Sequence, residues 1–205
     1  MKTRIRQLLA PLAHPVAGFE EYREKHTFPL FPSLVILALF FLGSIAKRQL
    51  TGFIFNWDDP EKINVFYILA ETVGAFLLWV GCNWAVSTLF DGKGRMREIW
   101  VVSAVSLIPY VASMYVYVLL SNLLTEDEGV FLSWILAVGM LYSLLLLCGG
   151  LSAVHEYSFG KVLWSSLITI GFMLILLFVC VLLFSLFQQV YGFFSDLARE
   201  FAFRV

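Results

Sequence analysis

The sequence is poor in charged residues and in cysteines. Only 14% of its 205 residues are charged, against about 25% in soluble domains, and 60% are hydrophobic, against about 45–50%. This composition excludes a water-soluble globular domain, which has too little interior for so much apolar surface. The three cysteines, Cys82, Cys148 and Cys180, all lie within apolar runs, so we expect neither a disulfide framework nor a cysteine metal site. With 14 basic and 15 acidic side chains, net charge does not indicate a nucleic-acid partner.

Five long apolar runs predict five membrane-spanning helices, because about 20 mostly apolar residues cross a bilayer. These runs are Leu30–Ala46, Val65–Phe90, Ile99–Leu124, Val130–Ala153 and Val162–Gln189. The sequence therefore predicts an all-α polytopic membrane protein, a bundle of five transmembrane helices with short interfacial helices at the termini. It divides into an N-terminal segment (1–29), a five-span membrane domain (30–190) and an amphipathic tail (191–205).

The interfacial helices are predicted from amphipathic patterns at both ends of the chain. Near the N-terminus, Ile5 and Leu8 recur at helical spacing beside basic residues, and near the C-terminus Phe194 and Leu197 share one side of a helix. Such segments lie in the plane of the membrane surface.

Basic residues in the short connections predict the orientation of the chain, because they remain on the cytoplasmic side. With a cytoplasmic N-terminus, that side holds nine Lys and Arg residues and the other side holds five. We therefore predict a multi-pass protein of the cell membrane with its N-terminus in the cytoplasm and its C-terminus outside.

Two stretches resemble catalytic or phosphate-binding motifs without matching them. In FDGKGRMRE, residues 90–98, the glycines flank one lysine between two spans, whereas a phosphate loop requires a strand before it and a Gly-Lys-Ser/Thr sequence. In HEYSF, Phe159 stands where a zinc protease needs its second histidine. We interpret both as turns between spans, and the Asp91-Gly92 pair as a tight turn in which glycine accepts a positive φ.

Four stretches together resemble the Yip domain family of Ypt/Rab-interacting membrane proteins. They are HPVAGFEEYR near the N-terminus, NWAVSTLFDGKGRMREIW, SLIPY in the third span and HEYSFGK after the fourth. The resemblance covers nearly the whole chain and implies five spans with a cytoplasmic N-terminus. Eukaryotic members are associated with Rab GTPases and vesicle traffic and carry a longer N-terminal region, so this chain is more similar to the prokaryotic members. The resemblance implies no catalytic residue.

Glu71 is an ionisable residue inside the second predicted span. Such residues are costly in lipid and usually face a partner or a cavity. On a regular helix Glu71 shares a face with Gly74, Ala75, Gly81 and other small residues, so we expect it to point into the bundle. The fourth span carries a weaker face of small residues: Gly139, Ser143, Gly149, Gly150 and Ala153.

A stripe of polar residues follows one face of the third span. It consists of Ser103, Ser106, Tyr110, Ser113, Tyr117 and Ser121. Its hydroxyls either hydrogen-bond between helices or line a wet groove for a small substrate or lipid headgroup, and Pro109 is expected to kink the helix beside it. Counting depth from the outer ends of the second and third spans, we predict that a neutral Glu71 carboxyl meets Tyr117, or Ser113 one turn deeper.

The predicted partner-docking face lies on the cytoplasmic side and consists of three stretches, the N-terminal HPVAGF and the turns FDGKGRMRE and HEYSFGK, with Asp91, Lys93, His155 and Glu156 as candidate residues. We predict a non-enzymatic accessory or scaffolding subunit that acts through helix and loop contacts, with membrane lipids and a membrane-protein partner or a second copy as its neighbours. The alternative is a small transporter or channel that uses the polar stripe and Glu71. The sequence contains no evident nucleophile–base pair or metal-ligand set, so we expect no cofactor.

Overall fold

A computed structural model describes residues 10–24, 28–56 and 62–203, and its elements are helical. They are α2 (Pro15–Glu24), α3 (Leu30–Leu50), α4 (Val65–Leu69), the π-helical turn η2 (Ala70–Gly74), α5 (Ala75–Leu89), α6 (Met96–Ser106), α7 (Ile108–Ser121), the short 3₁₀ helix η3 (Glu126–Glu128), α8 (Gly129–His155) and α9 (Phe159–Phe203). The described residues contain no strand, which confirms the all-α class.

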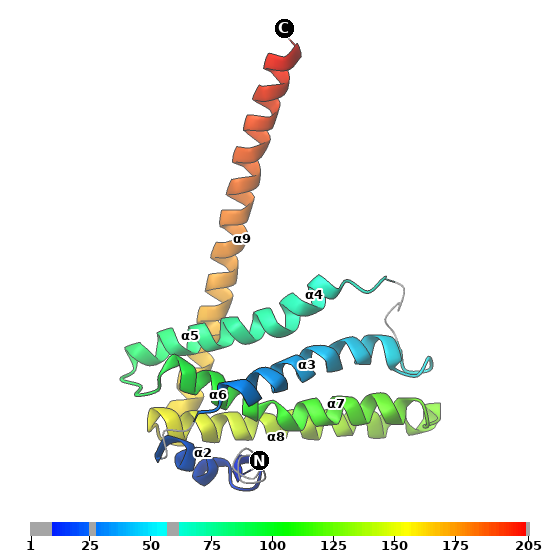
Figure 1. Ribbon diagram of the computed structural model, residues 1–205, viewed down its shortest axis with the longest axis vertical. Helices are drawn as coiled ribbons and strands as arrows, with labels where there is room; N and C mark the ends of the chain where they lie inside the picture. The colour runs from blue at the N-terminus through cyan, green and yellow to red at the C-terminus, as the bar shows by residue number, and fades with distance from the viewer. Residues whose placement is uncertain (1–9, 25–27, 57–61, 204–205) are drawn as a thin grey trace.

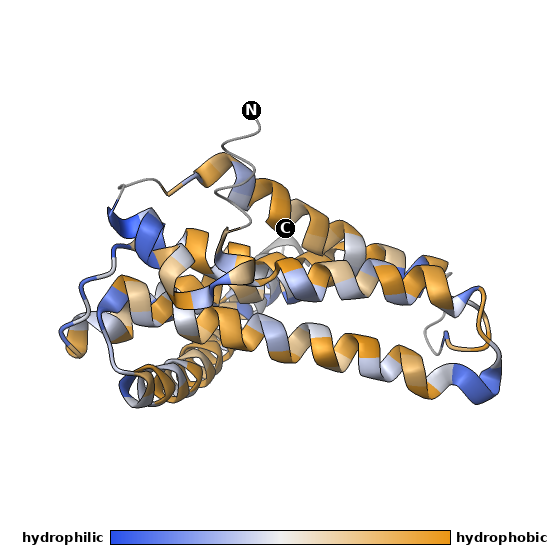
Figure 2. Ribbon diagram, turned by 90° about the horizontal axis from the view of Figure 1, so that it is seen from below, coloured by the Kyte–Doolittle hydropathy of each residue, from blue (hydrophilic) through white to orange (hydrophobic). Residues whose placement is uncertain are grey.

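Five helical stretches within the described residues are long and apolar enough to cross a membrane. They are Leu30–Leu50, Val65–Leu89, Met96–Ser121, Glu126–His155 and Phe159–Leu197. Figure 2 shows that hydrophilic residues gather at the ends of the bundle while the helices between are mostly hydrophobic. The protein is therefore a multi-pass membrane protein, as the sequence predicts.

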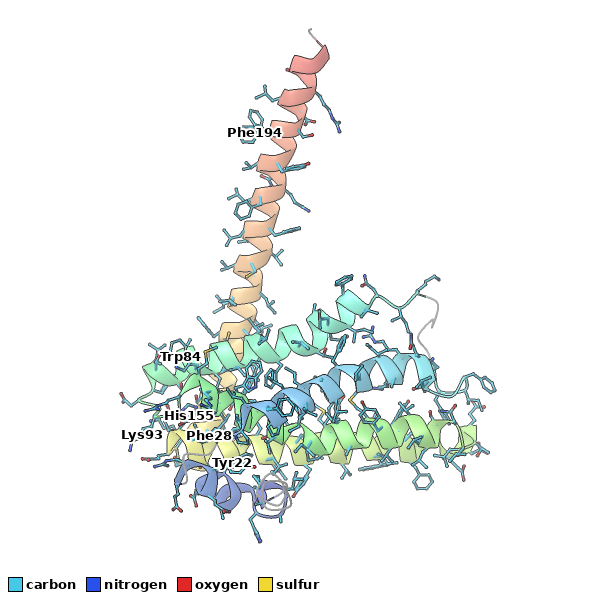
Figure 3. The ribbon with its side chains drawn as sticks, in the orientation of Figure 1. Tyr22, Phe28, Trp84, Lys93, His155 and Phe194 are labelled. Carbon is cyan, nitrogen blue, oxygen red and sulfur yellow. The ribbon has the colours of Figure 1, made fainter. Side chains whose placement is uncertain are left out.

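The first four of these stretches run back and forth along one direction (Figure 1). The end where α3 finishes, where α4 begins and where α7 meets α8 is called the Arg48 end. The opposite end, with the turn between α5 and α6 and the start of α9, is called the His155 end. Figure 3 places Lys93 and His155 there, close to Tyr22 and Phe28.

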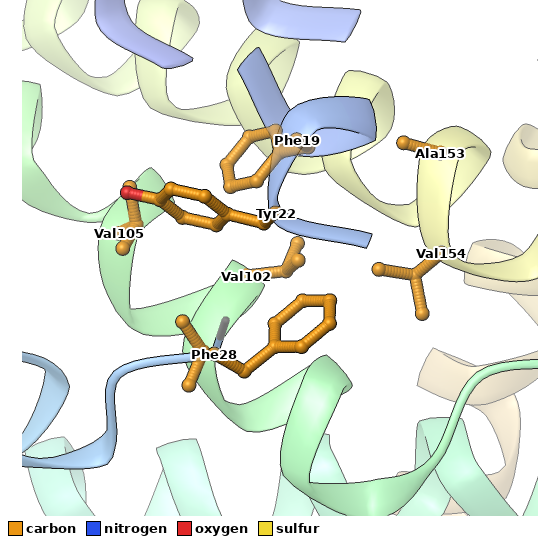
Figure 4. Packing of buried hydrophobic residues seen from close by; sticks show 8 residues of the cluster. Phe19, Tyr22, Phe28, Val102, Val105, Ala153 and Val154 are labelled. Carbon is orange, nitrogen blue, oxygen red and sulfur yellow. The ribbon is translucent and has the colours of Figure 1, made fainter. Parts of the chain in front are cut away.

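The N-terminal helix α2 packs into the His155 end. Phe19 and Tyr22 of α2 are buried with Phe28 in one hydrophobic cluster (Figure 4). The cluster also contains Val101, Val102 and Val105 of α6 and Ala153 and Val154 of α8. Burial of one large apolar side chain contributes about 1.5–3 kcal/mol to stability, so α2 is part of the folded body. The interfacial pattern around Ile5 and Leu8 falls outside the described residues.

The third span is divided at Leu107. Helix α6 ends at Ser106 and α7 begins at Ile108, with Pro109 in the first turn of α7. Proline has no amide N–H to donate to the preceding turn and its ring crowds the carbonyl four residues back. The helix is thus interrupted beside Pro109, at the place where the sequence predicts a kink.

Helix α9 packs against the bundle only through its first part. Val162, Ser165 and Thr169 are buried, whereas every residue from Leu174 to Tyr191 is exposed. In Figure 1, α9 rises away from the other helices at a steep inclination. The tail does not form the separate interfacial helix predicted from the sequence, because residues 191–203 continue α9 without a break.

Candidate functional site

The turn between α5 and α6 closes over the end of α8. Asp91 has a φ of 56°, so the positive φ lies at Asp91 and not at Gly92, where the sequence pattern had placed it. Gly92 is required by close approach, because a Cβ there would lie 2.7 Å from His155 Nδ1 and from the Tyr157 hydroxyl. The same holds for Gly94, whose Cβ would lie 2.5 Å from Val154 Cγ1. These glycines pack helices and do not form a phosphate loop.

His155 is buried beneath this turn at the centre of a directed hydrogen-bond chain. The Gly94 N–H donates to His155 Nδ1 at 3.3 Å, so the ring proton is assigned to Nε2, which donates to Asn83 Oδ1 at 3.4 Å. Asn83 Nδ2 donates to Thr169 Oγ1 at 3.4 Å, and that hydroxyl donates to the Ser165 carbonyl at 2.8 Å. This chain, the His155 network, joins α5, α8 and α9 through a neutral imidazole.

Glu156 links the three stretches that the sequence placed on one side. It follows α8 with a left-handed φ of 57°, and its carboxylate accepts hydrogen bonds from Arg23 of α2 and Lys93 of the turn. Arg23 Nη1 also donates to the Ala153 carbonyl at 3.0 Å. The Tyr157 ring stacks on His155 at 5.1 Å, and its hydroxyl donates to the Phe90 carbonyl at 2.9 Å. The His155 end is therefore held together by polar contacts between distant segments.

The four candidate docking residues lie together, but in different environments. His155 is 2% exposed, so its ring is unavailable to a partner, whereas Asp91, Lys93 and Glu156 are exposed. Sequence reasoning missed four of their neighbours, which are Arg23, Asn83, Tyr157 and Thr169. A polar residue inside an apolar run is a signal that could have identified Asn83 and Thr169.

The ion pairs of Glu156 with Arg23 and Lys93, called the Glu156 bridge, should make the stability of the protein depend on pH. The hydrogen bond from Lys93, aided by the charge of Arg23, lowers the pKa of Glu156 below its ordinary value. A lowered folded-state pKa means that the stabilisation is fully present above the usual glutamate range of about 4.3 and is lost as pH falls through the folded value. We expect the difference in melting temperature between the parent and Glu156→Gln to shrink between about pH 6 and pH 3. A difference that stays constant with pH would contradict this bridge.

Glu71 forms an ion pair near the Arg48 end. Arg48 Nη2 donates to Glu71 Oε2 at 2.5 Å, and the Arg48 guanidinium also lies 5.4 Å from the centre of the Tyr67 ring. The prediction that a neutral Glu71 meets Tyr117 or Ser113 is therefore wrong. Figure 1 shows α3 between α4 and α7. Arg48, near the end of α3, therefore pairs with Glu71 in place of a residue of α7.

The local helix geometry also changes the face on which Glu71 lies. Residues Ala70–Gly74 form a π-helical turn, which inserts an extra residue and rotates the following helix by roughly 100° relative to a regular one. A regular helix places Gly81 on the Glu71 face, yet a Cβ added at Gly81 would meet no atom of another helix within 4 Å. The small-residue face of this span is therefore not a close helix contact at Gly81.

The close contact occurs on the fourth span instead. A Cβ on Gly139 would lie 2.2 Å from Ser113 Oγ, and one on Gly150 would lie 2.4 Å from Val102 Cγ1. Helices α6 and α7 thus pack against the small-residue face of the fourth span, which has the weaker pattern in the sequence. Small residues let helix backbones approach closely.

Two adjoining cavities lie between the helices beside Glu71. The deeper cavity measures about 350 Å³ and the one nearer the Arg48 end about 290 Å³. They share four lining residues: Phe40, Glu71, Thr72 and Tyr110. Together they are called the Glu71 cavity.

The polar stripe of the third span contributes only in part to this cavity. Ser103, Ser106 and Tyr110 line it, whereas Tyr117 lies beneath the Lys47 ammonium, 5.4 Å from its ring centre. Three stripe hydroxyls, those of Ser106, Ser113 and Ser121, donate to carbonyls of the same span. The stripe is therefore mainly hydrogen-bonded within the protein.

Comparison with known families assigns the chain. The family model described as the Yip1 domain matches residues 9–195, which confirms the resemblance found in the sequence motifs. No curated protein and no solved structure matches. Among the described residues, no group of three or more His, Cys, Asp or Glu side chains could hold a metal ion.

Proposed function

The chain belongs to the Yip1 domain family, and from the position of α9 we propose that it is a non-enzymatic accessory or scaffolding subunit of a membrane assembly. It would act through helix faces and through the exposed residues of the His155 end. We further propose that the protein lies in the cell membrane with its N-terminus in the cytoplasm and its C-terminus outside.

The orientation of α9 carries this proposal. Its apolar stretch Phe159–Leu197 qualifies as a membrane span, as do the four stretches of the bundle, yet α9 leaves the bundle steeply (Figure 1). In this arrangement α9 does not run alongside the four stretches of the bundle, so contacts within the described chain do not fix the direction in which it crosses the bilayer. A membrane-protein partner or a second copy that engages α9 would fix its position in the membrane.

The surface of α9 suits such a contact. From Leu174 to Tyr191 the helix is exposed on every side, including the large apolar residues Phe178, Leu182 and Leu186. Within the described chain nothing else covers this stretch, so a helix from another chain can pack along it.

The alternative of a small transporter or channel has less support. Along the third span, the hydroxyls of Ser106, Ser113 and Ser121 bond to backbone carbonyls of their own span. Glu71 is paired with Arg48. The polar groups that a transport path would use are thus engaged in structural contacts.

Purification of the tagged full chain from native membranes in mild detergent tests the proposal. We expect a stoichiometric membrane-protein partner, or a second copy, to co-purify with the parent. Replacing Leu182 and Leu186 of α9 with alanine should reduce the amount of co-purified partner by about tenfold. This corresponds to a loss of roughly 1.4 kcal/mol of binding free energy. The matched control replaces Leu141 and Leu145 of α8, which are exposed to a similar degree and have the same spacing.

Two results would overturn the proposal. One is a parent chain that elutes as a monomer with no stoichiometric companion. The other is equal recovery of the companion by the α9 variant and by the α8 control, which would show that α9 does not make the contact.

A further inference from the structure

We propose that the Glu71 cavity binds one membrane lipid with an anionic headgroup. The headgroup would lie beside Lys47 and Arg48, and one acyl chain would extend into the deeper cavity. The inference is independent of the partner proposed for α9, because the two sites share no residue.

The size and continuity of the cavity fit a chain-like ligand. Its two parts share Phe40, Glu71, Thr72 and Tyr110, so they meet at one boundary. The deeper part, at about 350 Å³, is within the range of about 300–1,000 Å³ typical of ligand pockets. A ligand can therefore extend from the Arg48 end into the interior of the bundle.

The deeper part is apolar and reaches the side of the bundle. Its walls include the large side chains Phe76, Trp79, Leu107, Met140, Leu144 and Leu147. Met140 and Leu144 are 55% and 46% exposed, so the cavity borders the surface that lipid tails surround. An empty apolar space deprives its lining of dispersion contacts, and an acyl chain from the bilayer would restore them.

Short side chains keep this space open. Ala75, Ser106 and Ser143 line it, and two of them are fixed by hydrogen bonds. Ser106 Oγ donates to the Val102 carbonyl at 2.8 Å, and Ser143 Oγ accepts from the Tyr110 N–H at 3.0 Å. The first bond lies within α6 and the second joins α7 to α8, so both short side chains are held in place and leave the space beside them unfilled.

The charges at the Arg48 end select the headgroup. Lys47, Arg48 and Glu71 line the nearer part together with Ser44. Arg48 is paired with Glu71, whereas among the described residues Lys47 forms no ion pair and its ammonium lies over the Tyr117 ring. The charges of Lys47, Arg48 and Glu71 sum to one positive charge, which complements the negative charge of a phosphodiester. The cavity thus combines an apolar interior with a cationic mouth, as an anionic lipid requires.

Native mass spectrometry of the full chain in a neutral detergent tests the proposal with three probes. They are phosphatidylglycerol, phosphatidylcholine with the same acyl chains, and glycerol phosphate as a headgroup without chains. We expect one phosphatidylglycerol per chain with about fivefold higher affinity than phosphatidylcholine, the effect of one basic residue at a membrane surface. Glycerol phosphate alone should not bind.

Two variants separate the headgroup contact from the acyl-chain contact. Lys47→Gln should bring phosphatidylglycerol down to the affinity of phosphatidylcholine, whereas Arg199→Gln, a matched loss of one positive charge on α9, should not. Ala75→Phe should weaken both lipids by about tenfold, equivalent to the loss of about two buried methylene groups. Its control, Ala137→Phe, adds the same ring at a position of α8 that does not line the cavity.

Each contrary result is decisive. Equal binding of the two lipids by the parent, or equal effects of Lys47→Gln and Arg199→Gln, would reject recognition of the headgroup at this mouth. Unchanged binding by Ala75→Phe would show that the acyl chain lies elsewhere. Tight binding of glycerol phosphate would identify a free phosphate site in place of a lipid site.

Discussion

Gly139→Ala is expected to destabilise the membrane bundle by about 1–3 kcal/mol, the usual cost of overpacking. The added Cβ would lie 2.2 Å from Ser113 Oγ, 2.5 Å from Ser113 Cβ and 3.1 Å from the Pro109 carbonyl oxygen. Rotation of the hydroxyl removes only the first of these conflicts, because the other two atoms are fixed by the backbone of α7. Helices α7 and α8 must therefore separate, and the melting temperature in detergent should fall by roughly 2–12 °C.

Gly81→Ala is the matched control for this substitution. Gly81 also lies inside a helix, but nothing stands within 4 Å of its added Cβ. Alanine favours a helix over glycine by about 1 kcal/mol, so this variant should melt at or above the temperature of the parent. If Gly139→Ala behaved in the same way, the close approach of α7 and α8 at this point would be wrong.

Asn83→Leu is expected to have a similar cost, about 1–3 kcal/mol, because it leaves a buried donor without its acceptor. Asn83 is 1% exposed and accepts from His155 Nε2 while donating to Thr169. Leucine preserves much of the side-chain volume but can neither accept nor donate. The His155 ring would keep its bond from Gly94 and lose the one on its other side. Thermal melting in detergent and proteolysis at the turn after α5 should both report the loss.

Thr88→Val serves as the control for Asn83→Leu. Thr88 lies on the same helix, and its exposed hydroxyl donates only to the Ala85 carbonyl one turn earlier. A surface change of this kind is usually worth less than about 0.5 kcal/mol. Equal melting temperatures for Asn83→Leu and Thr88→Val would mean that the His155 network contributes little to joining α5, α8 and α9.

The membrane class, the five spans and the interruption before Pro109 can be predicted from the amino-acid sequence. These properties are local. Whether a helix can cross a bilayer depends on the hydropathy of about 20 consecutive residues, and proline disrupts hydrogen bonds within its own helical turn. The motifs around HPVAGF, FDGKGR and HEYSFGK also sufficed for the family. The topology of the spans placed these stretches at one end, where Arg23, Lys93 and Glu156 are in contact.

The pairing of the polar groups and the direction of α9 could not be predicted in this way. The partner of Glu71 is Arg48, 23 residues away, because α3 lies between α4 and α7 and a π-helical turn changes the register at Glu71. Asn83 and His155 are 72 residues apart, and no local pattern specifies that their helices meet. Hydropathy likewise identifies α9 as a span but carries no information on its direction. Pairing and direction depend on the order in which helices pack around one another, which is a property of the assembled bundle.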